Sequence, residues 1–111
     1  MSNTNFDNLR TANITRAIEW CGPDNKCSLE FNTIELCGET GELANAIKKY
    51  LRFKMGIPGG VNNLDNIREE IADVVICADL LAESLGINLG DAVRDKFNRT
   101  SEKHNFNTKL P

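Results

Sequence analysis

Apolar residues recur along the chain at the three- and four-residue spacing of α-helices, and they do not alternate as the residues of paired strands would. Glycine and proline interrupt the pattern at Gly22-Pro23 and in the loop sequence MGIPGGVNN, which a helix would not tolerate. The pattern predicts four helices, over about residues 4–21, 28–54, 66–85 and from 88 to a polar tail at 105–111. We therefore expect an all-α fold with the second and third helices at its centre.

Local signals place some of the helix ends. Asn66 with Glu69 three residues later is an asparagine form of the capping box, so the third helix should begin there. Gly86 is a natural residue to follow its last turn. Asn88, with Asp91 in the first turn, should begin the fourth helix.

Composition narrows the class of protein. A chain of 111 residues, of which 41% are hydrophobic, suits one domain spanning residues 1–111. The net charge of −3 argues against a nucleic-acid coat or a basic membrane-binding protein. No apolar run approaches the roughly 20 residues of a membrane span, and the start MSNTNFDNLR is unlike a signal peptide. We expect a soluble, cytoplasmic protein.

The cysteines and the single histidine exclude several kinds of site. The absence of an export signal predicts free thiols in a reducing compartment. No CxxC pair is present and His104 is remote from the cysteines, so zinc-ligand spacing is missing. One histidine cannot supply a di-iron bundle, and it makes a Ser-His-Asp triad improbable. The cysteines are Cys21, Cys27, Cys37 and Cys77, and we expect Cys77 to line the floor of the site as a small apolar group.

Two pairs of carboxylates carry the chemical signal. Glu39 and Glu42 lie three residues apart in the second predicted helix, and Glu70 and Asp73 have the same spacing in the third. This spacing leaves two side chains about 60° apart around a helix and about 4.5 Å apart along it. Each pair can therefore act as one bidentate ligand.

Apolar stripes beside these pairs indicate that the acids border the core. If the two helices pack antiparallel along the stripes, the four carboxylates converge and repel one another unless a cation joins them. Mg²⁺ prefers hard oxygen ligands and is commonly shared between carboxylates and substrate phosphates. The stripes comprise Leu36, Leu43, Ile47 and Tyr50 on the second helix and Ile67, Ile71, Val74, Ala78, Leu81 and Leu85 on the third.

Other readings of this region remain open. Glutamate is a good helix former, and ExxE also occurs on solvated faces. Glu35, one turn before Glu39, is either a further functional carboxylate or a solvated residue. Gly38 and Gly41 inside a helix indicate either close helix packing or backbone room beside the site.

The segments GETGEL and EEIADVV, in that order around a glycine-rich loop, resemble the ExxE…ExxD signature of MazG-like nucleoside triphosphate pyrophosphohydrolases. The resemblance runs from about Ser28 through LGINLGDAV to Lys96-Phe97, whereas residues 1–27 match only loosely. It implies an all-α enzyme that hydrolyses nucleoside triphosphates to monophosphate and pyrophosphate with Mg²⁺, or Mn²⁺ in its place. The metal ligands would be Glu39, Glu42, Glu70 and Asp73. Many members read EExGEL, and this chain has Gly38 in place of the first acid.

Several further residues are candidates for substrate binding. Lys96 and Arg99 lie three residues apart on the fourth predicted helix and could clamp phosphates, and Lys96 matches a Lys-Phe pair of related enzymes. Lys49 and Asn45 lie on the Glu42 side of the second helix and could reach a phosphate and a sugar or base, or be solvated. Trp20 is either a core residue or a platform on which a base stacks.

The sequence therefore predicts a Mg²⁺-dependent hydrolase of deoxynucleoside or modified nucleoside triphosphates, in the cleaning of nucleotide pools. Glu39 or Glu35 would be the general base. The alternative function is a catalytically silent helical module that binds a partner protein.

The two central helices carry more apolar surface than one neighbour can cover. We expect the surplus to meet a second copy of the chain, giving a homodimer or a tetramer built as a dimer of dimers, as MazG-like proteins do. The first or fourth helix of one subunit would then approach the metal site of the other. The surplus residues are Cys37, Ala44 and Leu51 on the second helix and Val75, Ile76, Leu80 and Ala82 on the third.

Overall fold

The structure is a computed structural model that describes residues 5–24 and 28–111. Over these ranges it contains helices and no strand, which confirms the all-α prediction. No helix in this part of the chain is long and apolar enough to cross a bilayer. The helices are α1 (Phe6–Cys21), α2 (Leu29–Met55), α3 (Leu64–Ser84) and α4 (Leu89–Lys103).

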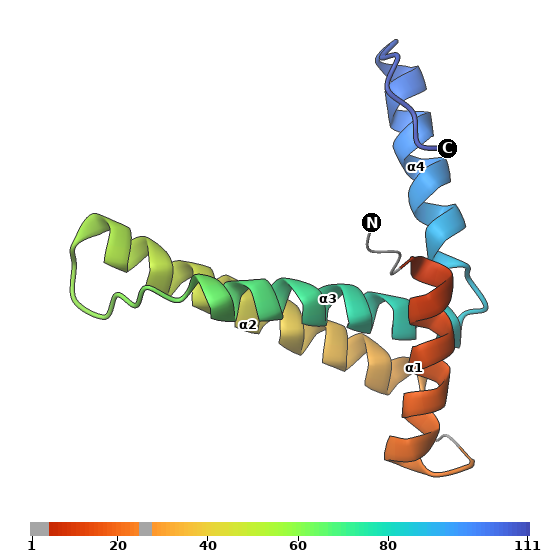
Figure 1. The fold of residues 1–111 in the computed structure, drawn as a ribbon, viewed down its shortest axis with the longest axis horizontal. Helices are drawn as coiled ribbons and strands as arrows, with labels where there is room; N and C mark the ends of the chain where they lie inside the picture. The colour runs from red at the N-terminus through yellow and green to blue at the C-terminus, as the bar shows by residue number, and fades with distance from the viewer. Residues whose placement is uncertain (1–4, 25–27) are drawn as a thin grey trace.

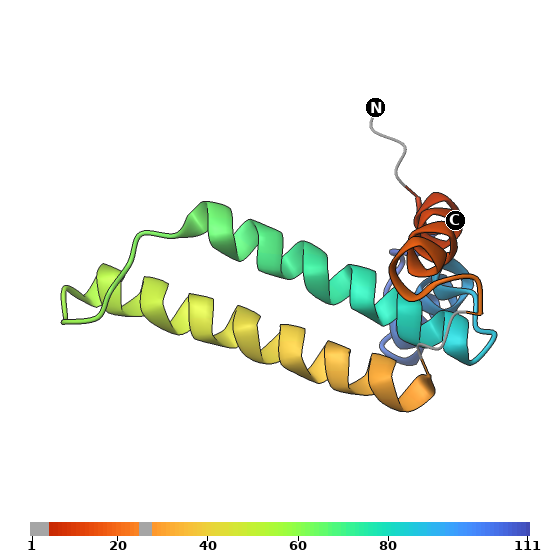
Figure 2. The same ribbon diagram turned by 90° about the horizontal axis from the view of Figure 1, so that it is seen from below.

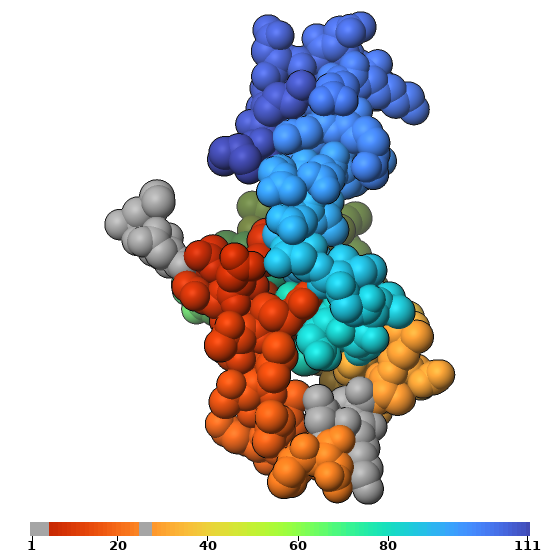
Figure 3. Space-filling view, turned by 90° about the vertical axis from the view of Figure 1, so that its right-hand side faces the viewer, coloured from red at the N-terminus to blue at the C-terminus, as the bar shows by residue number. Residues whose placement is uncertain are grey.

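Helices α2 and α3 form a long antiparallel hairpin, with their connecting loop at one end of the molecule (Figures 1 and 2). Helix α1 crosses the other end of the hairpin and packs against α3. Helix α4 packs against α1 and extends away from the hairpin, so that it stands apart in the space-filling view (Figure 3). The hairpin is therefore covered by α1 at one end only.

Most helix ends follow the local signals. The Ser28 side chain accepts a hydrogen bond from the Phe31 backbone N–H. Gly56, which follows the last residue of α2, adopts the left-handed conformation with φ 69°. Gly86, with φ 67°, follows α3. Asn88 caps α4 by accepting from the Asp91 N–H, as predicted. The predicted start of the first helix, Thr4, lies outside the described residues.

The predicted start of the third helix is wrong. Helix α3 begins at Leu64, so Asn66 is already inside its first turn and does not act as a cap. Asn63 occupies the cap position, but its side chain makes no cap hydrogen bond and donates instead to the Ala46 carbonyl of α2, at 3.2 Å. The contact with α2 thus outweighs the local capping signal.

The loop between α2 and α3 lies against the end of α2. The Val61 N–H donates to the Lys49 carbonyl at 3.1 Å. A Cβ atom on Gly60 would clash with the backbone nitrogen of Phe53, so there is no room for a side chain. The glycine-rich sequence therefore lets the loop fold back along the helix and brings Val61 and Asn63 beside Lys49.

A buried polar network joins α1 to α3. Asp79 is completely buried, and its carboxylate is 3.0 Å from the Arg10 guanidinium. Buried Asn13 donates to the same carboxylate at 2.9 Å and to the Ile76 carbonyl at 3.2 Å. Arg10 also donates to the Ile87 carbonyl at 2.7 Å. This network fixes α1 against α3 and against the turn that follows α3.

The predicted polar tail folds back onto α4. Asn98 donates to the Leu110 carbonyl at 2.9 Å and accepts from the Leu110 N–H at 2.7 Å. The Phe106 N–H donates to the Ser101 carbonyl. An asparagine side chain thus pairs with the tail backbone as a neighbouring strand would.

The prediction of free thiols holds for Cys37 and Cys77. It is wrong for Cys21, which is disulfide-bonded at the end of α1. Cys27 lies outside the described residues. The prediction of free thiols rested only on the expected reducing compartment.

The hairpin leaves apolar side chains exposed on one face. Leu51 of α2 is 52% exposed and Ile71 of α3 is 50% exposed. The surplus of exposed apolar surface on α2 and α3 is smaller than the sequence predicts. Ala82 is buried, and Ile76 and Leu80 are half-buried near α1. The apolar face that stays open comprises Cys37, Ala44, Ile47 and Leu51 of α2 and Leu64, Ile71 and Val75 of α3.

Candidate active site

The two predicted carboxylate pairs meet across the hairpin. Single oxygen atoms of Glu39, Glu70 and Asp73 lie within 4.8 Å of one another. Glu42 lies close enough to Glu39 and Glu70 for its charge to repel both of them. The antiparallel packing therefore brings all four acids into one cluster.

The cluster is electrostatically unfavourable by itself. Desolvation, followed by repulsion from Glu42 and Asp73, raises the pKa of both Glu39 and Glu70 above the ordinary glutamate value. The Oε2 atoms of Glu39 and Glu70 are buried and have no hydrogen-bond partner. Hard, desolvated oxygens that lack a donor fit a divalent cation such as Mg²⁺.

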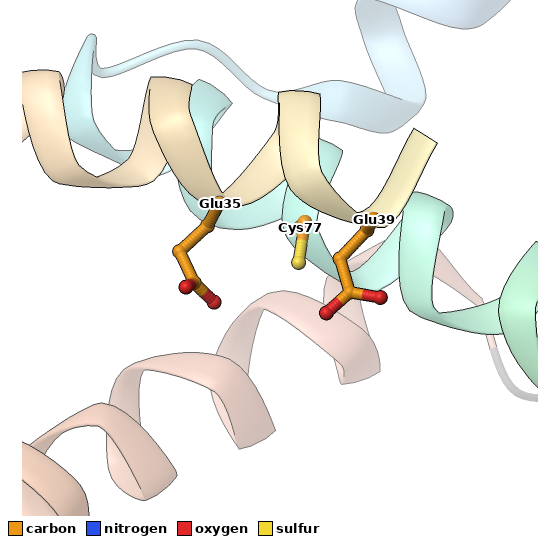
Figure 4. A group of neighbouring side chains, drawn as sticks. All are labelled: Glu35, Glu39 and Cys77. Atoms are coloured by element: carbon orange, nitrogen blue, oxygen red, sulfur yellow. The ribbon is translucent and has the colours of Figure 1, made fainter. Parts of the chain in front are cut away.

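A second group of side chains lies beside this cluster. Glu35, Glu39 and Cys77 offer ligand atoms within 4.8 Å of one another, and both glutamates extend from α2 toward α1 (Figure 4). Burial, followed by repulsion from the acids, raises the pKa of Cys77 to about 11. The cysteine therefore remains a thiol at neutral pH and is a poor nucleophile.

One cavity adjoins the acids on the side of the α2–α3 loop. It has a volume of about 390 Å³. Lys49 and Asn45 line it, beside Glu42 and Glu70. The loop adds Asn63, whose buried Oδ1 atom has no hydrogen-bond partner. We call this the loop cavity.

A second cavity, of about 290 Å³, lies on the other side of the acids, between α1 and the hairpin. We call it the α1 cavity. Glu35, Glu39 and Asp73 form its acidic wall, and Cys77 lines it as expected. Trp20 also lines it and is 82% exposed, so the core reading of this residue is wrong. The remaining lining residues are Asn13, Arg16, Ala17, Cys21, Phe31, Asn32, Ile76 and Leu80.

The two cations predicted on the fourth helix are not brought to the acids within one chain. Lys96 and Arg99 lie on α4, which packs against α1 and extends away from the hairpin. Neither residue lines either of the two cavities.

The two helix-interior glycines do not serve helix packing within the chain. A Cβ atom on Gly38 or Gly41 would meet nothing within 4 Å. Of the two predicted explanations, close packing against another described helix is wrong. The positions instead leave open space along α2 beside the acids.

Sequence reasoning missed the contribution of α1 to this region. Asn13, Arg16 and Trp20 recur at three- and four-residue intervals and face the α1 cavity together. That spacing was visible in the sequence, but α1 is only weakly amphipathic and its polar face gave no reason to expect a cavity. Asn63 was missed because a loop residue carries no periodic signal.

Comparisons with known proteins agree with this geometry. Residues 28–106 match the MazG nucleotide pyrophosphohydrolase domain. The chain is also similar to the Gene 37 protein of Mycobacterium phage L5, with 33% identity over 75 residues, which are 68% of this chain and 65% of that protein. The matched stretch thus spans slightly less than two thirds of its relative. No solved structure matches. The match covers most of the chain and includes all four acids, so this protein belongs to the MazG nucleotide pyrophosphohydrolase family.

Proposed function

We propose that the protein hydrolyses nucleoside or deoxynucleoside triphosphates to the monophosphate and pyrophosphate in a reaction that requires Mg²⁺. The observation that carries this proposal is the convergence of Glu39, Glu70 and Asp73, with buried carboxylate oxygens that have no partner. Such oxygens need a cation, and a cation shared with substrate phosphates is the usual arrangement for Mg²⁺. A role in cleaning cytoplasmic nucleotide pools is the biological setting we propose.

The metal would be held by the acid cluster of Glu39, Glu42, Glu70 and Asp73. Mg²⁺, or Mn²⁺ in its place, supplies an acidified water and a countercharge for the leaving pyrophosphate. The chain itself supplies the fixed geometry, since the acids lie on two packed helices and the loop is tied to α2.

Glu39 and Glu35 are the candidates for the general base. Both extend into the α1 cavity, one helical turn apart. One of them accepts a proton from the attacking water while the water oxygen bonds to the α-phosphorus. The bond from the α-phosphorus to the oxygen that bridges it to the β-phosphorus breaks, and its electron pair leaves with pyrophosphate.

Three further residues would bind the substrate within one chain. Lys49 in the loop cavity can neutralise a phosphate, and Asn45 beside it can hydrogen-bond a phosphate, sugar or base. Trp20 presents an exposed ring at the α1 cavity, on which a nucleobase can stack. Trp20, Glu35 and Glu39 all line the α1 cavity, so a stacked base would lie on the same side of the hairpin as the candidate bases.

The activity is tested by product analysis. Purified protein is incubated with Mg²⁺ and each common ribonucleoside and deoxyribonucleoside triphosphate, and the products are separated. We expect monophosphate with pyrophosphate; diphosphate with phosphate would indicate a different hydrolase. The rival function, a silent helical module that binds a partner protein, predicts no hydrolysis and no thermal stabilisation by Mg²⁺.

We further propose that the protein is a homodimer or a dimer of dimers. On α2 and α3 the exposed apolar face and the residues that line the cavities lie on opposite sides of the hairpin, judged by about 100° per residue. A second hairpin can cover the apolar face without blocking the cavities. Independently of this interface, we propose that α4 of a neighbouring subunit brings Lys96 and Arg99 to the acid cluster.

Sedimentation at low micromolar concentration tests the assembly. We expect a dimer or tetramer for the wild type, and we expect Ile71→Lys, which places a charge on the open apolar face, to shift it toward monomer. A folded, active wild-type monomer at that concentration would contradict the proposal.

A further inference from the structure

Arg16 lies in an acidic cavity, but it forms no ion pair with any of the nearby acids. It lines the α1 cavity together with Glu35, Glu39 and Asp73. The positive charge of Arg16 lowers the pKa of Cys77, although burial has a larger effect and raises it. Within the part of the chain that the structure describes, its guanidinium forms no ion pair and no hydrogen bond. The group is therefore free to bind an anion.

The position of Arg16 is fixed by the helix that carries it. One turn earlier, Asn13 is buried and hydrogen-bonded to the Asp79 carboxylate and the Ile76 carbonyl. Arg10, a further turn back, pairs with the same carboxylate. These contacts set the rotation of α1 and thereby turn Arg16 and Trp20 toward the cavity.

The order of side chains along the α1 cavity matches the order of groups in a nucleoside monophosphate. The acid wall lies on the hairpin, Arg16 faces it from α1, and Trp20 lies one turn beyond Arg16. The rings of Trp20 and Phe31 offer aromatic surface for a base. A planar guanidinium matches two oxygens of a phosphate, and it can do so beside a base stacked on the same helix.

We propose that Arg16 binds the α-phosphate of the substrate, the phosphate that stays with the nucleoside after cleavage. The proposal rests on the proposed function and adds to it where the nucleoside half of the substrate lies. Pyrophosphate then departs toward the loop cavity and Lys49. Arg16 would contact both the substrate and the monophosphate product, and it would not contact pyrophosphate.

Product inhibition shows which half of the substrate Arg16 binds, because each product corresponds to one half. The substrate is the triphosphate hydrolysed fastest in the product assay, and the inhibitors are its monophosphate and pyrophosphate. For Arg16→Gln we expect kcat/KM to fall about 10- to 100-fold and the inhibition constant of the monophosphate to rise by a similar factor. The inhibition constant of pyrophosphate should change less than about twofold.

Two further variants complete the design. Arg68→Gln removes the same charge from an exposed position of α3 that lines neither cavity, and it should match the wild type in all three constants. Arg16→Lys keeps the charge but loses the planar fork, so its constants should lie between those of wild type and Arg16→Gln. Arg16 is exposed and has no partner, so thermal unfolding of its variants should match the wild type.

The proposal is overturned if Arg16→Gln behaves as Arg68→Gln does, or if pyrophosphate inhibition weakens as much as monophosphate inhibition. Calorimetric titration of the wild type and Arg16→Gln with the common nucleoside monophosphates decides the matter without turnover. If the wild type hydrolyses no triphosphate but binds a monophosphate through Arg16, the proposed function fails and the assignment of Arg16 stands. If neither protein binds a monophosphate, the assignment of Arg16 fails.

Discussion

Glu70→Gln is expected to lower pyrophosphohydrolase turnover more than about a hundredfold. The variant removes a proposed metal ligand, and that loss should exceed the loss seen when a residue that only hydrogen-bonds to a metal ligand is replaced. The same substitution is expected to raise the thermal midpoint of the metal-free protein. Glu70 now lies desolvated beside Glu42 and Asp73, and its Oε2 atom has no partner. A neutral amide removes that repulsion and can donate a hydrogen bond to the remaining carboxylates.

Glu69→Gln is the matched control for this experiment. The substitution is the same and the position is adjacent, but Glu69 is exposed and lines neither cavity. Turnover and thermal unfolding are measured for both variants with and without Mg²⁺. Mg²⁺ should stabilise the wild type and Glu69→Gln but should have little effect on Glu70→Gln. Wild-type turnover by Glu70→Gln would refute the assignment of the metal ligands.

The opposed effects on turnover and stability would identify the acid cluster as a functional site. Carboxylates selected only for solubility would spread over solvated faces, whereas these four oppose one another across two packed helices. If these acids hold a cation as we propose, the cluster lowers the stability of the metal-free protein in exchange for that binding.

Much of the fold was predictable because it depends on local features. The helical spacing of apolar residues, the caps at Ser28 and Asn88 and the glycine after α3 are properties of a few neighbouring residues. The start of α3 was not predictable in this way. It depends on the bond from Asn63 to the Ala46 carbonyl, which exists only after the hairpin has closed.

The candidate site likewise has a part that local sequence spacing predicts and a part that depends on tertiary packing. ExxE and ExxD spacing fixes the relation of two acids on one helix, and the antiparallel hairpin brings the two pairs together. The role of α1 depends on its rotation against α3, which a buried carboxylate sets from 66 residues away along the chain. An aromatic residue on an amphipathic helix is more often buried in the core, yet the rotation of α1 places Trp20 at the open α1 cavity, where it is 82% exposed.

Asp79→Ala is expected to lower the free energy of unfolding by about 3–5 kcal/mol, since it leaves a partly buried guanidinium and a buried amide without their shared partner. Asp79 is completely buried, whereas Arg10 keeps 20% of its side chain exposed. Asn13 would also lose its bond of 2.9 Å to the carboxylate. Because these bonds join α1 to α3, the loss should fall on the docking of α1 more than on the hairpin.

Urea denaturation of Asp79→Ala and of Asp95→Ala measures this effect. Asp95 pairs with Arg94 at 3.0 Å, but both side chains are exposed, so its replacement should leave the unfolding free energy nearly unchanged. Asp79→Asn keeps an acceptor for Asn13 and should lose less stability than Asp79→Ala. Equal stability of Asp79→Ala and Asp95→Ala would contradict the expectation.

Since α1 carries Arg16 and Trp20, a folded Asp79→Asn protein should also bind nucleoside monophosphate more weakly while Mg²⁺ still stabilises it.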